Sequence, residues 1–230
     1  MKVSRTVKLL LTLSMGFVAA QASASIIISE VDPSGSSTST YAADWFELTN
    51  TGTTAVDITG WKMDDNSNAF ASAVALRGVT SIAAGQSVVF LEGNATGSTD
   101  ATIQAAFRSA WFGSNVPASL TLGGYGGSGV GLSQTTDAVN IFNAAGTLIT
   151  RVDFGAAAAG TFDNAAGLDN VTLTTKSAVG VNGAFASVTG GEIGSPGFVA
   201  AAAPVPLPAA AYLLVSGLGM FAGALRRKRT

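Results

Sequence analysis

The sequence predicts an all-β fold, a β-sandwich interrupted by one short helical insertion. The chain of 230 residues has 28 glycines, 11% charged residues and an apolar fraction of 47%. Glu and Lys, which favour helices, are scarce, whereas Val, Thr, Ile and Phe recur in short runs between turn residues. Several short strands separated by turns favour two sheets packed around one core.

Two strands are expected near the start of the domain. Ile26–Val31 is an apolar run, and the Asp32-Pro33-Ser34-Gly35 turn follows it. The segment Trp45–Thr49 alternates, so Phe46 and Leu48 should share one face of the strand while its other three residues share the opposite face. The side chains of this second strand should therefore divide between two environments.

Further strands are expected along the rest of the domain. Val56–Thr59 alternates between apolar and polar residues, and Gly60-Trp61 begins another strand. Ser87–Leu91 is continuously apolar in its last four residues, as in a strand covered on both faces. Ala138–Phe142 and Thr147–Phe154 flank a short loop containing glycine, which predicts a hairpin.

One helix should interrupt the strands. Asp100 is the expected cap and Gly113 the expected end of this helix. One face of the helix is apolar and carries Ile103, Phe107, Ala110 and Trp111. The stretch Gly123–Gly131 is too rich in glycine for regular structure, so we expect a mobile loop there.

The N-terminal segment, residues 1–24, predicts a cleavable signal peptide. A basic start precedes the apolar stretch Leu9–Ala20 and carries Lys2, Arg5 and Lys8. Small residues at Ala22 and Ala24 then place the cleavage before Ser25. The alternative is a retained anchor, but about a dozen apolar residues are too few to cross a hydrocarbon core of about 30 Å.

The C-terminal segment predicts a transmembrane helix at Ala209–Leu225, after a linker at residues 200–204. This run of 17 residues is apolar apart from Ser216 and small glycines. A basic cluster follows at once and consists of Arg226, Arg227, Lys228 and Arg229. Such a cluster places the C-terminus in the cytoplasm and the domain outside, which makes a buried core helix the weaker alternative.

A short motif precedes the apolar span and the basic tail, and its residues are Val205, Pro206, Leu207, Pro208, Ala209 and Ala210. With these three parts in order, the last 26 residues, 205–230, resemble a PEP-CTERM sorting signal in its V-P-L-P-A-A form. Leu207 replaces the central Glu of the name-giving tripeptide. The resemblance implies recognition by an exosortase, a membrane protease, in a Gram-negative bacterium that makes exopolysaccharide. Prolines 206 and 208 favour an extended backbone that a protease cleft can accept.

Composition excludes several function classes. The chain has no Cys and no His, so it lacks a thiolate nucleophile, a Cys-ligated metal site and a Ser-His-Asp triad. Between Ser25 and Leu225 there are five basic residues and all 14 carboxylates, which leaves a formal charge of −9. Such a surface repels phosphate backbones, so no nucleic-acid partner is expected. No cofactor is expected either.

Three groups of residues are candidate sites. Trp45 and Trp61 are a possible sugar-stacking platform, although core packing is the commoner role of such residues. Glu30 and Glu47 are a possible glycosidase pair, against the expectation that each is solvent-facing or bonds to a loop backbone. The run Asp64–Asn68 concentrates oxygen ligands that calcium accepts, yet it lacks the glycine and distal Glu of a calcium loop, which favours a polar turn.

A series of motifs occurs in order along the domain, residues 25–199: Ile28–Val31, Asp44–Asn50, Gly60–Asp65, Val88–Phe90, Asp137–Phe142, Gly146, Val152-Asp153 and the closing Gly194–Gly197. In these motifs the domain resembles a lamin tail domain over roughly Ile26 to Val199. It implies an immunoglobulin-like β-sandwich that serves as a binding or scaffolding module and catalyses no reaction. The helical insertion and the glycine-rich stretch depart from a minimal member.

We therefore expect an exported, non-enzymatic cell-surface or extracellular-matrix protein. Its expected partners are the general secretion machinery, an exosortase, the inner membrane before processing, and exopolysaccharide. The alternatives are a carbohydrate- or calcium-binding module and, less favoured, a glycosidase or lyase that uses carboxylates alone.

Overall fold

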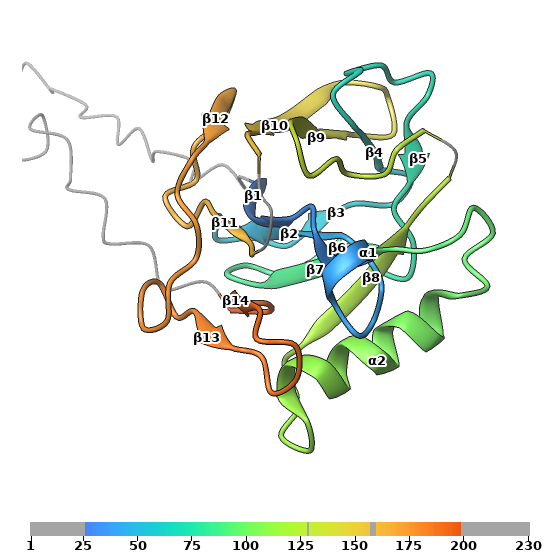
Figure 1. Ribbon diagram of the computed structural model, residues 1–230. Helices are drawn as coiled ribbons and strands as arrows, with labels where there is room; N and C mark the ends of the chain where they lie inside the picture. Colours follow the sequence, from blue (N-terminus) through green and yellow to red (C-terminus); the bar gives the residue numbers. More distant parts are fainter. Residues whose placement is uncertain (1–25, 128, 157–159, 199–230) are drawn as a thin grey trace, which may run out of the picture.

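The computed structural model describes residues 26–127, 129–156 and 160–198, and these form a β-sandwich of two five-stranded sheets (Figure 1). The first sheet has the order β11 (Phe162–Asp163), β1 (Ile26–Asp32), β2 (Trp45–Asn50), β7 (Ser87–Glu92), β8 (Thr121–Tyr125). The second sheet has the order β12 (Val171–Leu173), β10 (Leu148–Phe154), β9 (Asp137–Phe142), β4 (Lys62–Asp64), β5 (Val74–Ala75). The predicted all-β sandwich is confirmed.

Smaller elements complete the described part of the chain. Two short pairs are β3 (Val56–Asp57) with β6 (Ser81–Ile82), and β13 (Phe185–Ala186) with β14 (Ile193–Gly194). The helices are α1 (Gly35–Thr38) and α2 (Asp100–Phe112). The hairpin β9–β10 is antiparallel, as predicted, whereas β7–β8 and β10–β12 are parallel pairs.

The main core lies between the two sheets. Phe46 and Leu48 of β2 pack there with residues of the opposite sheet such as Val139 and Ile141, and all four are fully buried. Burial of large apolar side chains of this kind contributes about 1.5–3 kcal/mol each. The face assigned to Phe46 and Leu48 from the alternating sequence is therefore the core face.

A second apolar layer covers the outer face of the first sheet. Helix α2 places Phe107 and Trp111 against Trp45 of β2, with ring centroids 5.9 Å from Trp45 in both cases. Figure 1 shows α2 and the β13–β14 pair on the same side of this sheet. Because both faces of the sheet are covered, all six residues of β2 are buried, polar ones included.

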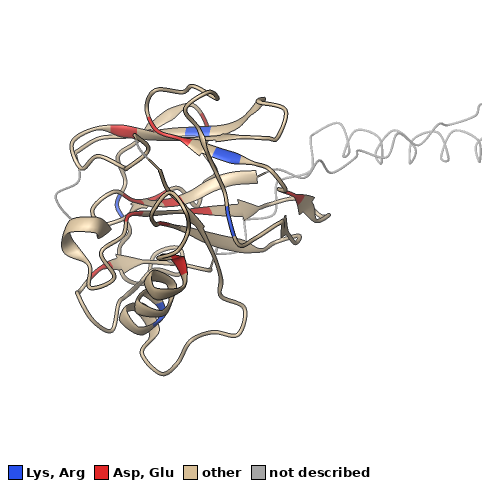
Figure 2. Ribbon diagram, turned by 90° about the vertical axis from the view of Figure 1, so that its right-hand side faces the viewer, with Lys and Arg blue, Asp and Glu red and all other residues tan. Residues whose placement is uncertain are grey.

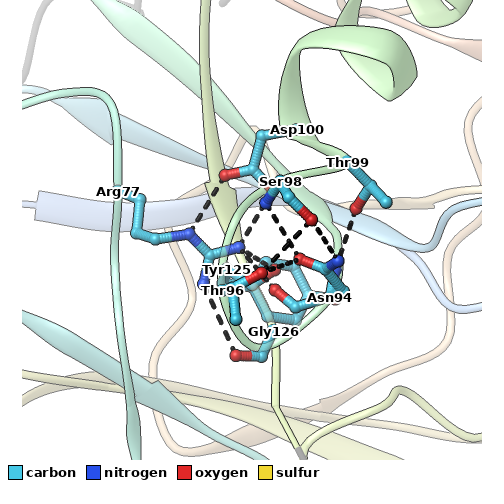
Figure 3. Close-up of polar contacts among 8 residues, drawn as sticks. All are labelled: Arg77, Asn94, Thr96, Ser98, Thr99, Asp100, Tyr125 and Gly126. Atoms are coloured by element: carbon cyan, nitrogen blue, oxygen red, sulfur yellow. Dashed lines mark hydrogen bonds and ion pairs between the residues drawn. The ribbon is translucent and has the colours of Figure 1, made fainter.

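The helix prediction holds in extent but not in its cap. Helix α2 begins at Asp100 after the N-cap residue Thr99, without a side-chain capping bond, and ends at Phe112, followed by the C-cap residue Gly113 with φ of 57°. The Asp100 carboxylate instead accepts bonds from Arg77 Nε and Nη2, each 3.0 Å long. The same guanidinium donates to the carbonyl of Tyr125 at 3.1 Å (Figure 3). The predicted cap is therefore wrong, because the Asp100 carboxylate is bonded to the Arg77 guanidinium instead.

The prediction of a loop over Gly123–Gly131 is wrong in its first part. Gly123 and Gly124 belong to β8, which pairs in parallel with Phe90 and Leu91 of β7. A Cβ at Gly123 would lie 2.5 Å from the Phe90 ring, and one at Gly124 would lie 2.4 Å from Asp100 Oδ2. The glycines therefore allow a close approach of strand to ring and carboxylate, which is a known role of glycine in strands.

The predictions for the two chain ends lie outside the described residues. These include cleavage between Ala24 and Ser25, the linker, the motif from Val205 to Ala210, the span Ala209–Leu225 and the basic cluster after it. Among the residues that the structure describes, no helix is both long and apolar enough to span a membrane.

Candidate functional site

Glu30 and Glu47 lie opposite each other on the antiparallel strands β1 and β2. A β-bulge at Ser29 shifts the register between Ile28 and Glu30, because Ile28 pairs with Leu48 and Glu30 with Glu47. The bulge inserts one extra residue, and Val31 beyond it returns to the core face. Both carboxyl groups are therefore brought together in the sheet, with exposed fractions of 1% and 0%.

Both carboxyl groups hold residues 192–197, which we name the closing segment. Glu30 accepts bonds from the Ser195 amide at 3.0 Å and from the Ser177 hydroxyl at 2.6 Å. Glu47 accepts a bond from the Gly197 amide, and one from the Ser29 hydroxyl at 2.7 Å. The closing segment is therefore hydrogen-bonded to β1 and β2, two neighbouring strands of the first sheet.

Burial sets the protonation of this pair. Burial in a low-dielectric interior raises the pKa of Glu30 above its ordinary value, and the hydrogen bonds from Ser177 and Ser195 oppose that rise only in part. The pKa of Glu47 is raised by burial and then by the charge of Glu30. Arg77 is paired with Asp100 and Arg151 with Asp153, so neither arginine neutralises this pair.

A second acidic contact lies at the other end of the closing segment. Tyr41 donates its hydroxyl to Glu192 Oε1 at 2.8 Å, and Trp45 Nε1 donates to the Tyr41 oxygen at 3.0 Å. Burial and the nearby charge of Asp32 raise the pKa of Glu192. Asp32 Oδ2 and Glu192 Oε2 are both buried, and neither atom has a hydrogen-bond partner among the described residues.

The geometry of Glu30 and Glu47 supports anchoring rather than glycoside hydrolysis. A glycosidase pair must face a cleft that admits a sugar, whereas the closing segment covers both carboxyl groups. The expectation that each Glu is solvent-facing is wrong, because the second layer buries the outer face of the sheet. The alternative expectation, a bond to a loop backbone, is confirmed at Ser195 and Gly197.

The tryptophan pair is part of the core. Trp45 is fully buried under α2, and Trp61 is 8% exposed and packs in the main core. A stacking platform for sugars requires an open indole face. Core packing is therefore confirmed and the platform is wrong.

The run Asp64–Asn68 forms a polar turn. The buried carboxylate of Asp64 accepts bonds from the Ser67 hydroxyl at 2.6 Å and the Ala69 amide at 2.7 Å. Asn68 has a φ of 50°, a left-handed conformation that asparagine tolerates. No group of three or more His, Cys, Asp or Glu in the described ranges is arranged to hold a metal ion. The carboxylate oxygens of Asp64 therefore accept hydrogen bonds that stabilise the turn.

Charges are sparse over the described domain. Figure 2 shows acidic residues on several strands and a few basic residues that lie apart from one another along the ribbon. The sequence indicated the excess of acid but not its burial: Glu30, Asp32, Asp44 and Glu47 are all at most 2% exposed. A Glu within an apolar run such as Ile26–Val31 was the signal for this burial.

Several residues of the site were not found from the sequence. Ser29, Thr161 and Ser177 contribute hydroxyls to the acidic pair, although isolated serines and threonines carry no pattern. Their partners are 18, 131 and 147 residues away along the chain, so only the fold brings them together. Gly194–Gly197 was the one readable signal, as a closing motif.

Comparison with known proteins gives one family. The family model described as Lamin Tail Domain matches residues 19–156, which is more than half of the chain. No curated protein and no solved structure matches the chain. The matched stretch ends shortly after β10, so the expected resemblance through Val199 is longer than the match, and the closing segment lies beyond it.

Proposed function

The chain belongs to the lamin tail domain family, and on that premise we propose that it is an exported, non-enzymatic protein of the cell surface or extracellular matrix. An exosortase processes its C-terminal tail. The domain acts as a binding or scaffolding module of immunoglobulin-like fold, with which the observed two-sheet sandwich is consistent. The precursor is tethered to the inner membrane before processing.

The observation that carries this proposal is the order of features at the C-terminus. The V-P-L-P-A-A motif, an uncharged apolar run and four consecutive basic residues follow one another at the end of a chain that begins with a signal-like segment. A buried core helix would not require the terminal cations, whereas a membrane span with cytoplasmic flank does. The run is marginal in length for a permanent anchor, which supports a transient one.

The burial of reactive groups supports a role without catalysis. Burial raises the pKa values of Glu30 and Glu47, and both carboxyl groups lie beneath the closing segment. Such groups in an open cleft would indicate an acid–base pair, but here their bonds hold the backbone. The family is also one whose domains typically perform no reaction.

Changing Pro206 and Pro208 to Ala tests the sorting role. The double variant keeps the apolar span and the basic cluster, so it should still reach the inner membrane, and immunoblots of fractionated producer cells should show the precursor accumulating there. A matched variant, Ala201→Ser, changes the linker only and should give the parent's surface yield. Equal surface yield from the double variant and the parent would leave a simple anchored protein.

Association with exopolysaccharide is the proposed role after processing. It rests on the family's binding modules and on the sorting signal rather than on a sugar site, since Trp45 and Trp61 are buried. Titration of the purified protein with the producer's own polysaccharide and, separately, with calcium tests it. Calcium binding without polysaccharide binding would favour the calcium module instead.

A further inference from the structure

An apolar groove of about 370 Å³ lies where α2, β13 and the end of the closing segment meet. Its walls include the side chains of Phe112, Pro117, Leu120, Phe185, Pro196 and Phe198. The volume falls in the range of about 300–1,000 Å³ typical of binding pockets. Ser119 is the only polar side chain of the lining, and no charged residue lines it.

The aromatic walls of the groove are held in place. The rings of Phe112 and Phe185 lie 5.5 Å apart, centroid to centroid, with an interplanar angle of 49°. The Phe198 ring packs on Gly183, where a Cβ would lie 2.3 Å from Phe198 Cδ1. Phe198 is nevertheless 54% exposed, so its ring forms one wall and leaves the groove open.

The chain leaves its described part at the wall of this groove. Pro196, Gly197 and Phe198 are its last three described residues, and the Phe198 amide donates to the Ser195 carbonyl at 2.9 Å. Only six residues, 199–204, separate Phe198 from Val205. Seven extended Cα-to-Cα steps reach at most about 25 Å, so the linker lets Val205 return to the groove.

The segment Val205–Pro208 has the chemistry that the groove accepts. It has no charge, and the chain carries none from residue 199 until Arg226. Alternating prolines favour a polyproline II backbone, which loses little entropy on binding, and aromatic-lined grooves recognise such segments. A short linker also gives an effective concentration on the order of millimolar, so a weak site suffices.

We propose that the groove beside Phe198 binds the chain's own Val205–Pro208 segment in cis. Leu207 and the neighbouring proline rings pack against Phe112, Leu120 and Phe185. If the segment is the sorting motif, which rests on the proposed function, docking shields it from the protease. Processing then requires release of the segment, so the domain itself regulates access to the motif.

Disulfide trapping tests the contact in the full chain. The protein has no Cys, so the double variant Ser119→Cys, Val205→Cys contains just the two thiols needed. It is expressed in a host without an exosortase and oxidised mildly in isolated membranes. The expected result is an intramolecular disulfide, formed at least tenfold faster than in the control Asn66→Cys, Val205→Cys. Asn66 is exposed and follows β4, at the far end of the sandwich from β13 in Figure 1.

A third change, Leu207→Gln, separates groove binding from mere proximity. It lies in the tail, outside the described domain, and should slow the Ser119–Val205 disulfide at least fivefold while the domain's Tm stays unchanged. Equal rates in the groove pair and the control pair would overturn the proposal, as would no effect of Leu207→Gln. A disulfide between two chains would show that the segment binds a second copy and would overturn binding in cis. None of these readouts depends on tail processing.

Discussion

Glu30 and Glu47 form a buried, directly opposed pair across β1 and β2, and both accept hydrogen bonds from backbone amides of the closing segment. Arg77 and Arg151 form their ion pairs with other carboxylates, those of Asp100 and Asp153. Two like charges in one buried site oppose each other's ionisation. Burial and this repulsion therefore favour a state in which at least one of the two carboxyl groups keeps its proton.

Stability should fall as the pH rises from about 5 to about 8. The pKa values of Glu30 and Glu47 are raised above 4.5 in the folded state, and that of Asp44 is raised by burial from 3.8 to about 7. The folded protein thus binds protons more tightly than the unfolded chain. The contribution is fully present below the unfolded pKa and is lost as pH rises through the folded pKa. Thermal unfolding at a series of pH values measures it, and a Tm that rises toward pH 8 would contradict the account.

Replacing Glu47 by Gln should weaken this pH dependence. A neutral amide keeps an acceptor for the Gly197 amide and removes one of the two opposed charges, so the Tm at pH 8 should equal or exceed the parent's. Glu47→Ala instead removes the acceptor of the Gly197 amide, which should cost about 1–3 kcal/mol at pH 5. The control Asp57→Asn changes an exposed carboxyl and should retain the parent's slope between pH 5 and 8. An unchanged slope in Glu47→Gln would argue against the pair as its source.

Gly124→Ala should destabilise the domain by about 1–3 kcal/mol, because the new Cβ would lie 2.4 Å from the Asp100 carboxylate, which is held by Arg77. Gly155→Ala is the matched control, since no atom lies within 4 Å of its Cβ position. Denaturant unfolding of the two variants gives the comparison. Equal denaturation midpoints for the two variants would show that the close approach of Gly124 to Asp100 does not matter for stability.

The sequence predicted the strands whose pattern is local and missed those defined by distant partners. Trp45–Asn50 and Ser87–Glu92 were readable from alternation and from a continuous apolar run. Strand β8 was not predicted, because glycines such as Gly123 and Gly124 have low strand propensity. These glycines are needed because a side chain at either position would clash with Phe90 or Asp100.

The candidate site was likewise predicted where its pattern is local and missed where it depends on distant partners. Glu30 and Glu47 were recognised as a possible pair, but their burial depends on the closing segment, about 150 residues away in sequence for Gly197. The second layer of helix α2 and β13–β14, which covers the outer face of the sheet, has no local signature in β1 or β2. A residue's chemistry could be read from the sequence, whereas its exposure required the fold.

The most direct test of the proposed export and sorting is the intact mass of the protein recovered from the cell surface. The account predicts a chain that begins at Ser25 and lacks at least Arg226–Arg229, because both ends are processed. Its mass should therefore lie well below the 22.9 kDa of the full chain, apart from any added group. A surface protein that still carries both Met1 and the basic tail, at the full mass, would contradict it.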